Sequence, residues 1–221
     1  MRTQVTTRPG AVGAGPGAGP SAGGGTGMGA VRRGDMMAYA RYKREVLGSL
    51  SGTVLEIGAG HGANFGYLAA GIDWIGLEPD PAARRTLATI AAAHGHHRPV
   101  IASVAERIPL PDASVDAVAG TLVLCSVADQ AMVLAQVRRV LRPGGRFVFF
   151  EHVAAPRGTA SRGLQRCCAP LSRRLAAGCD PARETWRAIA SAGFRDVQFR
   201  WFSRRPAIGL FSHYLGGTAQ A

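Results

Sequence analysis

From residue 53 onwards, short apolar runs alternate with segments in which apolar side chains recur every three or four positions. The first pattern is typical of buried strands and the second of helices that pack through one face. Strands are predicted at residues 53–57, 73–77, 99–104, 115–124 and 146–152. Helices are predicted at residues 36–50, 63–69, 81–93 and 130–141. This alternation indicates right-handed βαβ units, and therefore an α/β fold with a doubly wound, mostly parallel sheet.

Beyond residue 156 the periodicity is weaker. Helices are predicted over residues 161–177 and 181–192, and strands at 196–202 and near 208–215. Residues 1–34 are rich in glycine, alanine and proline and contain few large apolar side chains. Such a segment cannot bury enough surface to offset the entropy of ordering it. We therefore expect a disordered tail over 1–34 and a single domain over 35–221.

The apolar runs are too short for a membrane protein. The longest candidate, residues 117–128, is well below the roughly 20 residues that a bilayer crossing needs. The N-terminus begins Met-Arg-Thr-Gln, and no apolar signal-peptide core follows it. The sequence therefore predicts a soluble, cytoplasmic protein without stable membrane association. The pattern does not indicate an oligomeric state.

The formal net charge of +12 would suit nucleic acid, an anionic membrane surface or acidic small molecules. Lys43 is the only lysine, however, so the charge comes almost entirely from arginine. A GC-rich genome produces this bias without any function, and the blocks of positive charge expected of a nucleic-acid-binding arm are missing. We therefore expect no nucleic-acid partner.

Cysteine and histidine positions give no metal-binding pattern. Cys125, Cys167, Cys168 and Cys179 show no paired C-x-x-C spacing, and in this setting they are expected to be reduced thiols. The histidines of residues 94–97 lie in a small, polar, loop-like stretch without nearby cysteines. No metal site is predicted from the sequence.

A glycine-rich turn follows the first predicted strand and carries the most informative pattern. It reads Glu56-x-Gly58-x-Gly60-x-Gly62, which differs from the G-x-G-x-x-G of dinucleotide-binding proteins. Glu56 suits a ligand with a positive centre, and no lysine follows the loop to bind a phosphate. Glu78 ends the second predicted strand, about 20 residues further on, where an acid suits the hydroxyl groups of a ribose.

Several motifs in order and spacing resemble those of class I S-adenosylmethionine-dependent methyltransferases with the type 11 domain. They are the glycine loop, Glu78, residues 105–112, residues 114–116 and residues 141–145. Five further segments resemble the thiol S-methyltransferase group of methyltransferase-like proteins, namely residues 62–65, 121–127, 151–154, 178–180 and 183–186. The wider resemblance runs from about residue 41 to residue 213.

The resemblance implies a class I methyltransferase Rossmann-like fold: a seven-stranded sheet whose last strand is antiparallel, with helices on both faces. It also implies S-adenosyl-L-methionine as cofactor, a cofactor-binding half over about 50–155 and a substrate-capping part over about 157–195. The cofactor residues implied are Glu56, Gly58, Ala59, Gly60, Gly62, Asn64, Glu78, Pro79, Ala105, Glu106, Thr121 and Leu122. Many relatives have Asp where this chain has Val104, so backbone groups or Glu106 would have to hold the adenine amine.

The substrate implied is a small molecule, with a thiol as the favoured methyl acceptor. An O- or N-methyltransferase of secondary metabolism, an RNA or DNA methyltransferase and an inactive cofactor-binding partner are the alternatives. The segment after the fourth predicted strand lacks the Asn/Asp-Pro-Pro-aromatic element that holds a flipped base, which disfavours the nucleic-acid enzymes.

His152, at the end of the fifth predicted strand, is the first candidate for a general base, and fixing the turn at residues 151–154 is its alternative role. His213, in the last predicted strand, is a weaker candidate that would point into the pocket. Eleven arginines against three acids between residues 157 and 205 either bias the pocket towards anionic substrates or form a solvated face.

Overall fold

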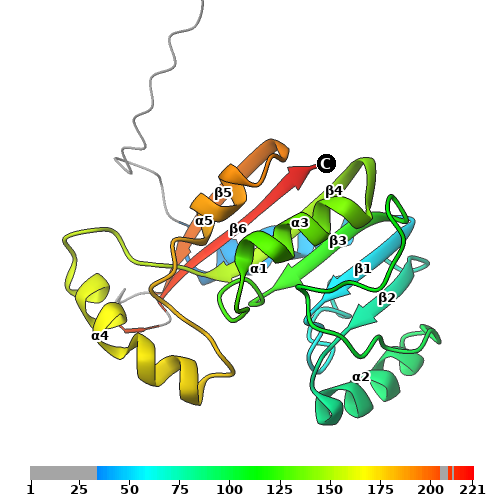
Figure 1. Cartoon of the computed structure of the whole chain (residues 1–221), viewed down its shortest axis with the longest axis horizontal. Coiled ribbons are helices and arrows are strands. Elements are labelled where there is room, and N and C mark those ends of the chain that lie inside the picture. Colours follow the sequence, from blue (N-terminus) through cyan, green and yellow to red (C-terminus); the bar gives the residue numbers. More distant parts are fainter. Residues whose placement is uncertain (1–33, 205–208, 211) are drawn as a thin grey trace, which may run out of the picture.

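The computed structural model describes residues 34–204, 209, 210 and 212–221. These residues form one six-stranded sheet in the order β2-β1-β3-β4-β6-β5 (Figure 1). The strands are β1 (Thr53–Ile57), β2 (Asp73–Leu77), β3 (Val115–Thr121), β4 (Leu141–His152), β5 (Arg195–Ser203) and β6 (His213–Gln220). The first four are parallel, and β6 runs antiparallel to both of its neighbours. The predicted class of fold is confirmed, including the antiparallel last strand. The predicted tail, apart from Gly34, lies outside the described residues.

Five helices accompany the sheet in this part of the chain. They are α1 (Met36–Gly48), α2 (Pro81–Ala93), α3 (Gln130–Val140), α4 (Ala160–Leu175) and α5 (Thr185–Ser191). Each of the first four helices is preceded by a residue whose side chain accepts a backbone N–H of the first turn. These residues are Asp35, Asp80, Asp129 and Thr159. None of the helices among the described residues has both the length and the hydropathy needed to cross a bilayer.

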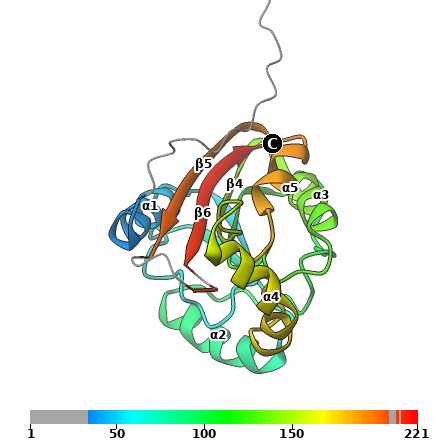
Figure 2. The same cartoon turned by 90° about the vertical axis from the view of Figure 1, so that its left-hand side faces the viewer.

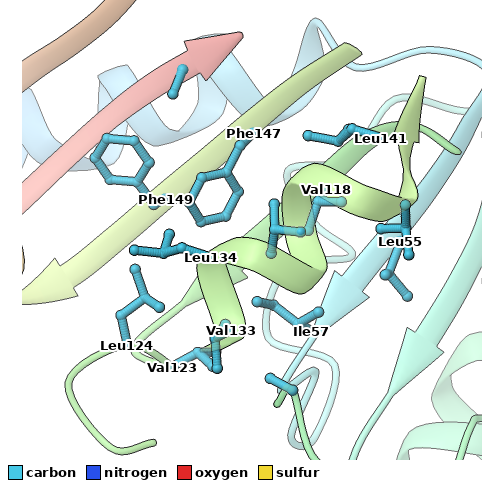
Figure 3. Packing of buried hydrophobic residues seen from close by; sticks show 14 of the residues in the cluster. Leu55, Ile57, Val118, Val123, Leu124, Val133, Leu134, Leu141, Phe147 and Phe149 are labelled. Atoms are coloured by element: carbon cyan, nitrogen blue, oxygen red, sulfur yellow. The ribbon is translucent and has the colours of Figure 1, made fainter. Parts of the chain in front are cut away.

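Helices cover both faces of the sheet and enclose two apolar cores (Figure 2). Strand β4 supplies both cores because successive side chains of a strand point to opposite faces. Phe147 and Phe149 pack with Leu134 of α3 on one face, as Figure 3 shows, together with Ile189 of α5. The side chains of β4 that alternate with them, Val148 and Phe150, pack on the other face with residues of α1 and α2.

The strand predicted at residues 99–104 is not formed, which leaves six strands instead of seven. Only Ile101 pairs with β2, through an isolated bridge to Leu77. Its N–H donates to Gly76 O at 2.8 Å, and its carbonyl accepts from Glu78 N at 3.0 Å. Pro99 has no N–H to donate, and Ser103 N instead donates back to the Ile101 carbonyl. The ladder therefore ends after one residue.

Three other predictions need correction. The helix predicted at residues 63–69 is a series of turns, in which Tyr67 N and Leu68 N both donate to Asn64 O. The strand predicted at 115–124 ends at Thr121, because Leu122 adopts a left-handed φ of 59°. The strand predicted near 208–215, part of which lies outside the described residues, instead runs from His213 to Gln220.

Helix α4 stands at the side of the molecule towards which β3 and β4 point (Figure 1). Buried Gln165 attaches it to the chain that leaves β4. The Gln165 amide donates to Val153 O at 3.2 Å, and its oxygen accepts from Ala155 N at 2.6 Å. One side chain thus fixes the helix next to the carboxyl edge of the sheet.

Close packing of β6 between β4 and β5 gives a test of the fold. A Cβ at Gly217 would overlap the Gln198 carbonyl oxygen and the Phe149 ring. We expect Gly217→Ala to lower the free energy of unfolding by about 1–3 kcal/mol, because the backbone cannot give way. Denaturant unfolding measures this change. The matched control is Gly163→Ala in α4, where a Cβ meets nothing within 4 Å. That variant should be slightly more stable than wild type. An unchanged Gly217→Ala would contradict this packing.

Candidate active site

The loop that follows β1 is held against the end of β2. Gly58, Gly60 and Gly62 all have positive φ, at 57°, 56° and 77°. At Gly58 a Cβ would also lie 2.6 Å from a methyl group of Val123, so only glycine allows the loop to pass this close to the segment after β3. Ala59 N donates to Leu77 O at 3.2 Å. The loop therefore has one defined path across the carboxyl edge of the sheet.

Glu78 connects this loop to the residues after β2. One carboxylate oxygen accepts from Gly60 N at 2.8 Å and the other from Asp80 N at 2.9 Å. The side chain is almost buried, yet it lines a cavity. A carboxylate offers about four lone-pair positions. The two that remain leave Glu78 able to accept two further hydrogen bonds from a ligand.

Glu56 lies under the loop and is 2% exposed. Its two oxygens accept from Asn64 Nδ2 at 2.7 Å and Trp74 Nε1 at 2.8 Å. Burial raises the pKa of Glu56, while these hydrogen bonds and the charge of Lys43 act in the opposite direction. Burial in turn lowers the pKa of Lys43 to about 8. The carboxylate thus organises the residues beneath the loop.

Asn64 connects this network to β3, since its Nδ2 also donates to Thr121 Oγ1 at 3.1 Å. Its Oδ1 is a buried polar atom for which the described residues supply no hydrogen-bond partner. An unpartnered buried acceptor costs about 1–3 kcal/mol, so such atoms in native structures call for an explanation. A ligand that brings an N–H or O–H donor to this position would satisfy it.

A cavity of about 490 Å³ lies at this edge of the sheet. Its walls include six of the residues predicted to bind the cofactor, namely Gly58, Glu78, Pro79, Ala105, Glu106 and Leu122. Val104 also lines it, and Glu106 Oε1 is engaged by Ala128 N at 2.9 Å. A larger hollow of about 630 Å³, lined by residues of α3 and α5, contains none of the predicted residues. The smaller cavity is therefore the candidate site.

The segment after β3 forms one wall of the cavity and is fixed by Glu151. This fully buried carboxylate accepts from Val123 N at 3.1 Å, Leu124 N at 2.9 Å and Cys125 N at 3.0 Å. Burial raises the pKa of Glu151 well above its ordinary value. Leu122, which precedes the three donors, is strained at positive φ, and its N–H donates to Phe150 O at 2.7 Å. This role of Glu151 is not among the predictions from the sequence. The available signal was an acid directly after an apolar run in a predicted core strand.

Cys125, His152 and Cys179, which lie far apart in the sequence, come together next to this segment. Cys179 Sγ lies 3.5 Å from Cys125 Sγ and 3.5 Å from His152 Nδ1. Both cysteines are buried, and the His152 ring packs on Tyr214 with centroids 4.9 Å apart. The candidate base thus faces a thiol through Nδ1. The second candidate, His213, is buried, and its Nδ1 lies 3.0 Å from Ser212 Oγ.

Several of the arginines after residue 156 have structural partners. Arg162, Arg187 and Arg157 surround Glu184, with N–O distances of 2.9, 2.7 and 3.5 Å. Arg183 Nη1 donates to Leu124 O at 3.0 Å and to Val127 O at 2.6 Å. Three of these arginines are therefore paired with Glu184, and Arg183 connects this part of the chain to the segment after β3.

Comparison with known proteins gives a consistent result. Residues 55–149 match a family model described as "Methyltransferase domain". Thiol S-methyltransferase TMT1B of Rattus norvegicus is 39% identical over 152 residues, which cover 67% of this chain and 62% of the rat protein. The human protein of the same name is 38% identical over 167 residues, covering 71% of this chain and 68% of the human protein. The chain thus spans about two thirds of the length of these relatives.

Solved structures agree in fold. Geranyl diphosphate C-methyltransferase from Streptomyces coelicolor, solved with S-adenosyl-L-homocysteine, has a TM-score of 0.62 at 17% identity, covering 83% of this chain and 75% of the other. The [4+2]-cyclase SpnF has a TM-score of 0.63 at 18% identity, covering 85% and 83%. Fold, family model and relatives together show that the chain belongs to the class I S-adenosylmethionine-dependent methyltransferases.

Proposed function

We propose that this protein S-methylates a small thiol, with S-adenosylmethionine as the methyl donor. The cavity at the carboxyl edge carries the proposal, because it combines the glycine loop, Glu78 and the fixed segment after β3. Two curated relatives that match about two thirds of this chain bear the name thiol S-methyltransferase, which supports a thiol as acceptor.

The residues present fit the cofactor. Glu78 has free lone pairs for the two ribose hydroxyls, and the unpartnered Asn64 Oδ1 offers an acceptor to the ammonium group at the methionine end. Glu56 holds Asn64 in place for this contact, while the loop of Gly58, Ala59, Gly60 and Gly62 backs the same end. Pro79, Ala105 and Glu106 are proposed to contact the adenosine part, and Thr121 and Leu122 the region of the sulfur. When bound, S-adenosylmethionine supplies an electrophilic methyl group on a sulfonium sulfur.

The chain's contribution to transfer is to position the acceptor and exclude water. Proximity and orientation supply on the order of 7–11 kcal/mol of such a barrier. A thiol needs little further activation, because with a pKa of about 8.5 it is partly ionised near neutral pH. An acceptor of this class does not require His152 as a general base, in contrast to a phenol or an alcohol.

Replacing Glu78 tests the cofactor site. We expect Glu78→Ala to weaken S-adenosylmethionine binding at least tenfold, because two charge-assisted contacts of about 1.5–3 kcal/mol each are lost. Isothermal titration calorimetry measures the affinity. Asp112→Ala removes a surface acid that lines neither cavity and should bind like wild type. Equal affinities for wild type and Glu78→Ala would refute the assignment of Glu78.

The acceptor class is tested with a panel of small thiols, phenols, amines and RNA together with methyl-labelled cofactor. We expect label in the thiols, at a rate that rises with pH and levels off once the thiolate predominates, because the thiolate is the nucleophile. Methylation of phenols or amines with no labelled thiol would instead establish an O- or N-methyltransferase and overturn the thiol proposal.

A further inference from the structure

Cys125, His152 and Cys179 form a group of soft ligand atoms that the fold assembles from three separate segments. Cys125 lies after β3, His152 ends β4, and Cys179 follows α4. One ligand atom from each lies within 4.8 Å of the other two. Two thiol sulfurs and an imidazole nitrogen are a donor set that Zn²⁺ prefers.

Two of the three separations are close to those of a tetrahedral zinc site, and the third is within 4.8 Å. With Zn–S bonds of about 2.3 Å and Zn–N bonds of about 2.0–2.1 Å, tetrahedral angles place two sulfurs about 3.8 Å apart and a sulfur and a nitrogen about 3.6 Å apart. The observed distances are 3.5 Å from Cys179 Sγ to Cys125 Sγ and 3.5 Å from Cys179 Sγ to His152 Nδ1. A metal ion could therefore bind with shifts of a few tenths of an ångström along both contacts.

The segments that carry the cysteines are fixed independently of any metal. Asp180 N donates to Cys125 O at 2.8 Å, so the two cysteine segments are joined directly. Ser172 of α4 donates to Cys179 O at 2.8 Å, and Glu151 accepts the N–H of Cys125 at 3.0 Å. At Gly178 a Cβ would lie 2.8 Å from Ser126 O, so the two segments touch backbone to backbone. The backbone that carries the two cysteines is thus held in place without help from a ligand.

We propose that Cys125, His152 and Cys179 bind a zinc ion and leave its fourth position for the sulfur of the methyl acceptor. Among the described residues the group contains three protein ligands, which is the number found in catalytic zinc sites, whereas structural sites have four. The group also adjoins the cavity: Ser126, which lines it, has its hydroxyl 3.6 Å from Cys125 Sγ. The binding of zinc stands on this geometry alone, and the role of the fourth position rests on the proposed function.

Methyl transfer at this site is a displacement at the methyl carbon. The acceptor thiol loses its proton to solvent when its sulfur takes the fourth position. That sulfur then forms a bond to the methyl carbon while the bond from this carbon to the sulfonium sulfur breaks, and the electron pair of the broken bond stays with the cofactor sulfur. The product is a neutral thioether, a weaker ligand than a thiolate, and it leaves the metal. His152 acts here as a ligand and not as a base.

Metal content provides the first test. The full chain is purified under reducing conditions, stripped with a chelator, incubated with Zn²⁺ alone and freed of excess metal before elemental analysis. We expect about one zinc per wild-type chain, a large loss in Cys125→Ser, Cys179→Ser and His152→Ala, and full retention in the control Cys167→Ser, whose cysteine is exposed on α4. Because Cys125 is buried in the core, its replacement could unfold the chain and so remove the zinc indirectly. The melting temperature of wild type is therefore measured as well, and we expect it to rise when zinc binds. Failure of the reduced wild type to bind zinc, or equal loss in Cys167→Ser, overturns the site.

Replacing zinc with Co²⁺ separates this inference from the proposed function. A tetrahedral site with two thiolates gives visible ligand-field bands and near-ultraviolet sulfur-to-cobalt absorption, and we expect both in wild type without any substrate. A small thiol should then shift these bands as it takes the fourth position. Cobalt bands that no thiol shifts, or thiol methylation at the full rate by a metal-free enzyme, would overturn the acceptor role of the fourth position. The second result would leave the proposed function intact, and the zinc site itself is decided by the metal content.

Discussion

Glu151 is the penultimate residue of β4, its carboxylate is fully enclosed, and three consecutive backbone N–H groups donate to it. Enclosing a carboxyl group costs several kcal/mol and raises its pKa, and hydrogen bonds to it are worth about 1.5–3 kcal/mol each. The residues that donate, Val123, Leu124 and Cys125, belong to the segment that forms one wall of the cavity. Glu151 is therefore the main buried side chain that fixes the path of the chain after β3, and with it the position of Cys125.

The other two buried acids at the carboxyl edge act in a related way. Glu78 accepts backbone N–H groups from the glycine loop and from the residue that caps α2, while Glu56 holds Asn64 and Trp74. Glu151 and Glu78 fix backbone donors of segments that line the cavity, and Glu56 fixes side-chain donors close to the glycine loop. A rim held by acids remains in place before a ligand arrives, which is the preorganisation that a methyl-transfer site requires.

Polar contacts attach the C-terminal third to the segments that follow β3 and β4. Arg183 binds two carbonyls of the segment after β3, and Gln165 holds α4 to the chain that leaves β4. These contacts also bring Cys179 beside Cys125 and His152. The proposed acceptor site thus depends on how α4 and the chain after it pack against the segment after β3 as much as on the glycine loop.

The sequence by itself determined the parallel α/β sheet, the glycine loop, the acid at the end of β2 and the resemblance to the methyltransferases, because each depends on residues close together in the chain. Residues 99–104 form only one bridge and residues 63–69 are turns, although the apolar pattern predicted a strand and a helix there, because local backbone hydrogen bonds to Ile101 O and Asn64 O replace the regular ones. The sequence also did not reveal the group of Cys125, His152 and Cys179, whose members lie up to 54 positions apart. Only tertiary structure brings such residues within 4.8 Å, because the contact depends on where three separate segments end at one edge of the sheet.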